Sequence, residues 1–79
     1  MSFFRVGKYE VRAWAFGSMR PNGRRMKGHW SISDPTIETE EPILTGACSI
    51  DRETDVEAIN DAMIAGRVAA DKLLKKHSG

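Results

Sequence analysis

The fold is decided by RVGKYEVRAWAFGSMRPNGRRMKGHWSIS, residues 5–33. Small or apolar side chains alternate with bulkier or charged ones over residues 5–16, and the alternation resumes over residues 25–33. A period of two is typical of a strand with one buried face. Between the two stretches, Pro21 fixes its own φ, and the Asn-Gly pair after it accepts the positive φ of a tight turn. The stretch therefore predicts a β-hairpin.

The register of this hairpin determines which side chains share a face. With Asn22-Gly23 as a two-residue turn, Ala15 would lie opposite Trp30. The face toward the core would then hold Tyr9, Val11, Ala13, Ala15, Met26, Trp30 and Ile32. The outer face would hold Arg12, Trp14, Phe16, Arg25, Lys27 and His29. A slip of one residue would instead join Trp14, Phe16, Met26, Trp30 and Ile32 in an aromatic core. We favour the first register because Tyr9, Val11 and Ala13 make a cleaner inward set.

The rest of the chain predicts a loop, a third strand and a helix. Residues 34–42, with prolines near both ends and four acids, predict a loop, and residues 43–50, ILTGACSI, predict a strand. Thr54 and Glu57 fit a helix-capping box, and apolar residues then recur at helical spacing, which predicts a helix over 55–76.

The predicted fold class is therefore α+β. We expect a single domain, residues 1–79, with a three-stranded antiparallel meander followed by one long C-terminal helix, in the order β-β-β-α. The helix covers one face of the sheet, and the other face is left for water or a partner.

Charge is distributed unevenly although the net charge is only +1. Residues 1–30 carry a formal charge of +6, residues 31–61 carry −8, and residues 62–79 carry +3. Such segregation favours self-association or an oppositely charged partner if the fold preserves it, whereas folding that brings the segments together would neutralise it locally. The small net charge argues against a general nucleic-acid coat.

Catalysis and cofactors are not expected. Cys48 is the only cysteine, so no internal disulfide can form, and with two histidines it cannot complete a four-ligand zinc site. The sequence holds no nucleophile elbow and no phosphate-binding loop, and a single sheet layer leaves little room for a small-molecule substrate. We expect no catalytic residue, no metal and no cofactor.

The lone cysteine and the lack of a signal peptide or membrane span indicate a cytoplasmic protein.

Two classes of function fit this sequence. The first is a protein-binding module, which binds another protein or itself as a homodimer through the uncovered sheet face or a strand edge. The alternative is a nucleic-acid-binding domain that uses the basic first hairpin. The same contact residues serve both hypotheses: Arg12, Trp14, Phe16, Arg20, Arg24, Arg25, Lys27 and His29. The small net charge and the acidic middle segment favour the first.

Two resemblances accompany these patterns. YEVRAW, then GHWSIS, then a T-x-x-E helix start followed by AGRVAADKLL resemble small bacterial proteins of uncharacterised function, which implies no activity. The β-β-β-α order with an Arg- and Trp-bearing hairpin resembles in layout the plant ethylene-response DNA-binding domain and the integrase arm-type domain. That likeness implies DNA contacts from the outer sheet face through Arg12, Trp14, Arg25 and Lys27.

Overall fold

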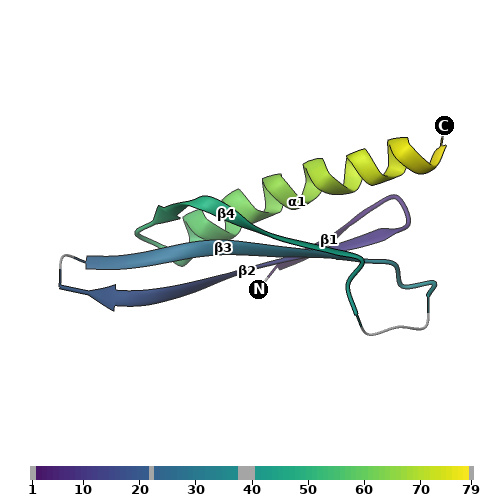
Figure 1. Cartoon of the computed structure of the whole chain (residues 1–79). Helices are drawn as coiled ribbons and strands as arrows, with labels where there is room; N and C mark the ends of the chain where they lie inside the picture. Colours follow the sequence, from purple (N-terminus) through teal and green to yellow (C-terminus); the bar gives the residue numbers. More distant parts are fainter. Residues whose placement is uncertain (1, 22, 38–40, 79) are drawn as a thin grey trace.

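The chain forms one antiparallel sheet with a long helix along one of its faces (Figure 1). A computed structural model describes residues 2–21, 23–37 and 41–78. The elements are β1 (Ser2–Val6), β2 (Tyr9–Arg20), β3 (Gly23–Ser33), β4 (Leu44–Arg52) and α1 (Asp55–Ser78). The strands lie in the order β1-β2-β3-β4, so each pairs with its neighbour in sequence.

The predicted three-stranded sheet is wrong, because the sheet has four strands. The segment expected to be one strand, residues 5–16, contains a turn: Val6 pairs with Tyr9 across Gly7 and Lys8. Gly7 has a φ of 60° while Lys8 does not have a positive φ, the combination found in a type II′ hairpin turn. The chain before Gly7 therefore folds back as β1 along the outer edge of β2.

The β2–β3 register also differs from the predicted one. Arg20 pairs with Gly23, and Trp30 lies opposite Ala13 instead of Ala15. Gly23, at a φ of 127°, is the first residue of β3, so the connection begins one residue earlier than expected; Asn22 itself lies outside the described residues. The observed register is displaced from the predicted one by two residues, and side chains alternate between the two faces of a strand with a period of two. The predicted assignment of side chains to the two faces is consequently right although the register is wrong.

The core lies between the sheet and α1. Val11 and Ile32 are fully buried and form one cluster with Tyr9 and Ala70. The helix approaches the sheet closely because small residues face it: a Cβ added at Gly28 would collide with the carbonyl oxygen of Ala58. The other small residues of α1 on this side are Ala62, Gly66 and Ala70, all buried.

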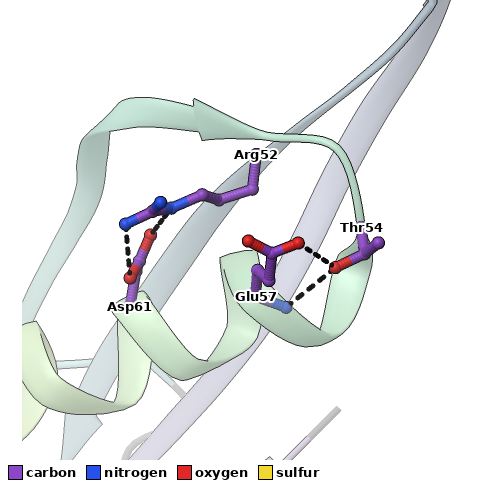
Figure 2. A network of polar contacts seen from close by, with 4 residues as sticks. All are labelled: Arg52, Thr54, Glu57 and Asp61. Atoms are coloured by element: carbon purple, nitrogen blue, oxygen red, sulfur yellow. Dashed lines mark hydrogen bonds and ion pairs between the residues drawn. The ribbon is translucent and has the colours of Figure 1, made fainter.

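The predicted helix and its cap are confirmed, with α1 extending to Ser78. The Glu57 amide donates to Thr54 Oγ1 at 3.2 Å, and the Thr54 hydroxyl donates to Glu57 Oε1 at 2.9 Å (Figure 2). One turn later, Arg52 Nε donates to Asp61 Oδ2 at 2.7 Å, which ties the end of β4 to the helix. These contacts fix the direction in which α1 leaves the sheet.

Folding brings parts of the basic and acidic segments together. Lys27 of the basic N-terminal segment lies opposite Asp51 on β4, and Lys8 Nζ lies 3.9 Å from Asp34 Oδ2. The segregation of charge along the sequence is therefore partly neutralised in the fold.

Asp34, at the end of β3, is a buried acid held by the turn that follows it. Its Oδ1 accepts hydrogen bonds from the Thr36 hydroxyl at 2.6 Å and the Thr36 amide at 2.9 Å. Lys8 Nζ lies 3.9 Å from Oδ2. The hydrogen bonds from Thr36, together with Lys8, lower the pKa of Asp34 below its ordinary value of 3.8, against the opposing effect of burial.

Gly28→Ala should destabilise the fold by about 1–3 kcal/mol, because the added methyl meets backbone of α1 and forces the helix away from the sheet. Urea denaturation measures the change. Ser49→Ala, at an exposed position of β4, is the control and should stay within about 0.5 kcal/mol of the wild type. Equal stability of Gly28→Ala and wild type would contradict the close helix–sheet contact.

Thr36→Val should raise the pKa of Asp34 toward 3.8, because it removes the hydroxyl donor that contributes most to the lowered value. A lowered folded-state pKa stabilises the fold at pH values above 3.8 and the stabilisation is lost as pH falls through the folded-state pKa. Carboxyl-carbon NMR titration of Asp34 reads the shift directly. Thr45→Val makes the same change at an exposed position of β4 and should leave Asp34 unaffected.

Candidate functional site

The outer face of the sheet, on the side away from α1, carries aromatic and basic side chains from three strands. Trp14 pairs with His29 and Phe16 pairs with Lys27, so the side chains within each pair share that face. Phe3 of β1 pairs with Arg12, which places both on the same side. We call this set the outer face: Phe3, Arg5, Arg12, Trp14, Phe16, Lys27 and His29.

His29 is the centre of an aromatic cluster on this face. Its ring stacks on Trp14 with centroids 6.1 Å apart and an interplanar angle of 14°. Phe16 meets the same imidazole edge-on, with centroids 5.4 Å apart and an angle of 77°. Aromatic pairs of this kind contribute about 0.5–1.5 kcal/mol each, so the three rings are held in a defined arrangement. Phe16 nevertheless remains 65% exposed, which leaves ring surface available to a ligand.

A shallow open depression lies beside the cluster. It has a volume of about 530 Å³ and is lined by Arg12, Trp14, Phe16 and Ser31. Arg12 Nε donates to Glu10 Oε1 at 3.0 Å, and much of the Arg12 side chain stays exposed. The depression therefore combines ring faces with a cation and a hydroxyl, which suits a planar ligand that also carries negative charge.

The β2–β3 hairpin extends past the end of β4 and the start of α1 (Figure 1). Pairing with β4 reaches Met26, opposite Arg52, and pairing with β1 stops at Ala13. Residues 17–20 of β2 and 23–25 of β3 thus project as a two-stranded arm. Arg24 and Arg25 lie on this arm; Arg20 ends β2, and its side chain lies outside the described residues.

A second hollow lies between β4 and α1, on the other side of the sheet. It has a volume of about 350 Å³, and its lining includes Cys48, Ile50, Arg52, Asp61 and Ala65. Burial and the nearby Asp61 raise the pKa of the Cys48 thiol above its ordinary 9.0, so it stays protonated and is a poor nucleophile. The Arg52 guanidinium is bound to Asp61, which raises its pKa further. The Arg52–Asp61 contact ties β4 to α1.

The structure brings most of the predicted contact residues together. Arg12, Trp14, Phe16, Lys27 and His29 share the outer face, while Arg24 and Arg25 lie on the arm beyond it. Two contributors, Phe3 and Arg5, were not predicted, because β1 was not recognised as a separate strand. The alternation of SFFRV and the Gly7-Lys8 turn carried that signal.

Within the described parts of the chain, no group of three or more His, Cys, Asp and Glu side chains is arranged to hold a metal ion. The one described helix is too polar to cross a membrane. Comparison with models of protein families, with curated proteins and with solved structures finds no significant match to this chain.

Proposed function

We propose that this protein is a non-enzymatic, cytoplasmic binding module whose outer face takes up single-stranded nucleic acid. The observation that supports this most strongly is the partly exposed cluster of Trp14, Phe16 and His29 on a sheet face that no helix covers. Bases stack on such rings without regard to sequence, because every base has a π-face.

The charges around the rings support the same ligand. Arg12 lines the depression beside Trp14 and Phe16, and Lys27 lies opposite Phe16 on the neighbouring strand. Cations next to stacking rings are positioned to meet the phosphates that link stacked bases. Glu10 and Asp51 lie on the same face as Arg12 and Lys27 respectively, so the face is only moderately basic and a modest affinity is expected.

Unpaired strands fit this face better than a duplex. In a duplex the ring faces of the bases are covered by their neighbours, whereas in a single strand they can splay onto a sheet surface. On the projecting arm, Arg25 lies opposite Ser18, on the outer-face side, where it can supply a phosphate contact at one end of the track. Arg24 lies opposite Met19, on the reverse side of the arm. In this proposal the rings hold bases and the arm orients the backbone.

Self-association through the outer face is the second candidate. It is favoured by large apolar side chains of the outer face that remain open to solvent: Phe3 is 71% exposed and Phe16 is 65% exposed. Apolar surface of this kind is also typical of protein interfaces. The effect of salt distinguishes the two candidates, because phosphate binding weakens as the salt concentration rises and apolar association does not.

Phe16→Ala should weaken binding of a short single-stranded oligonucleotide roughly tenfold, since one stacking contact contributes about 1–3 kcal/mol. Fluorescence anisotropy with a labelled mixed-sequence strand gives the affinity. Val56→Ala removes an exposed apolar side chain from α1 and serves as the matched control, with no loss expected. If the two variants bind alike, the aromatic cluster is not the binding site. If Phe16→Ala abolishes a concentration-dependent increase in mass without nucleic acid, self-association is the function.

Arg24→Glu combined with Arg25→Glu should weaken binding at low salt and reduce the dependence of affinity on salt concentration, because phosphate contacts are lost. Lys72→Glu combined with Lys76→Glu changes net charge equally but lies on α1, away from the outer face, and should retain most of the affinity. Anisotropy titrations at several salt concentrations compare the two. Equal losses in both would mean that overall charge, and not the arm, governs binding.

A further inference from the structure

Phe3 of β1 places an exposed ring on the outer face, apart from the aromatic cluster. The contacts of that cluster join Trp14 and Phe16 to His29. Phe3 pairs with Arg12 of β2, so the two side chains stand next to each other on the same face. Because the residue is 71% exposed, its ring offers a ligand a separate surface beside the Arg12 guanidinium.

Phe3, Trp14 and Phe16 form a row across the outer face, which we call the aromatic row. Trp14 and Phe16 are two residues apart on β2, and their backbone positions are therefore separated by about 7 Å. Phe3 lies opposite Arg12, which precedes Trp14 by two residues, so Phe3 is a diagonal neighbour of Trp14 at about 7–8 Å. The row thus runs from β1 along β2 toward the projecting arm.

The spacing of the aromatic row determines the form of the strand that fits it. Bases stacked on one another follow at intervals of about 3.4 Å along a strand. The rings of the row are about twice as far apart, at about 7 Å. A strand whose bases stay stacked on one another therefore cannot place consecutive bases on consecutive rings. An unpaired strand whose bases are splayed apart can do so.

Charged side chains lie along the aromatic row and beyond both of its ends. The cations on this side of the four strands are Arg5, Arg12, Arg25 and Lys27, and the acids are Glu10 and Asp51. Arg5 lies beyond Phe3 at one end, and Arg25 lies beyond Phe16 at the other. Cations outnumber acids among these residues, which favours a polyanion over a second copy of the same face.

We propose that the aromatic row holds three consecutive, splayed bases, one each on Phe3, Trp14 and Phe16, and that the ligand is consequently a pyrimidine-rich single strand. This inference rests on the proposed function and names the class of strand. Neighbouring pyrimidines stack on one another more weakly than neighbouring purines, so separating them costs less free energy. The preference comes from the cost of unstacking the ligand, and it needs no hydrogen bond to a base edge.

Fluorescence anisotropy with labelled thymine and adenine DNA strands of equal length, at one salt concentration, tests this inference. The wild type should bind the thymine strand at least about threefold more tightly. Phe3→Ala should weaken binding of the thymine strand roughly tenfold, whereas Phe3→Tyr keeps a ring and should retain most of the affinity. Met19→Ala removes an exposed side chain from the reverse side of the arm and is the control, with no loss expected. Thermal melting confirms that each variant is folded.

Two results would overturn the inference and leave the proposed function standing. One is a folded Phe3→Ala variant that binds the thymine strand as tightly as the wild type while Phe16→Ala binds it weakly, which would confine the site to β2 and β3. The other is an adenine strand that binds as tightly as the thymine strand, which would mean that the bases are not splayed. A wild-type protein that binds neither strand would overturn the proposed function and this inference together.

Discussion

The pairing of β2 with β3 is the constraint on which the rest of the structure depends. Val11 lies opposite Ile32, and both are fully buried beneath α1. Because side chains alternate along each strand, burying this pair also commits Arg12 and Ser31 to the other face, followed by Trp14 with His29. The aromatic cluster on the outer face is therefore a direct consequence of how the core is paired.

The second constraint is the short distance between helix and sheet. Glycine at positions 28 and 66 and alanine at positions 58, 62 and 70 allow α1 to lie directly on β2 and β3. Trp14 and Phe16 lie on the opposite face of the sheet. Among the described residues α1 is the one helix, and because it packs on the other side of the sheet it does not cover these rings.

The sequence predicted correctly those elements that depend on contacts between residues close together in the chain. The Thr54–Glu57 cap is a contact between residues three apart, and helical spacing needs only one helix turn to be visible. The hairpin register was displaced by two because the sequence allows a tight turn at either Pro21-Asn22 or Asn22-Gly23. Because the register differs from the predicted one by an even number of residues, each side chain still lies on the face that was predicted for it. β1 was missed because residues 5–16 were interpreted as one continuous alternation, although Val6 pairs with Tyr9 and the chain reverses at Gly7 and Lys8.

In the proposed function, nucleic acid binds the outer face and not the opposite side of the sheet. Two-dimensional amide NMR of labelled protein, titrated with a short single-stranded oligonucleotide at low salt, tests it most directly. Trp14 lies on the outer face, whereas the Trp30 ring packs against Gly46 on the helix side and serves as an internal reference. We expect salt-reversible shifts of the Trp14 indole and of amides near Phe16 and His29, with little change at Trp30. Shifts centred on Trp30, or none at all, would contradict it.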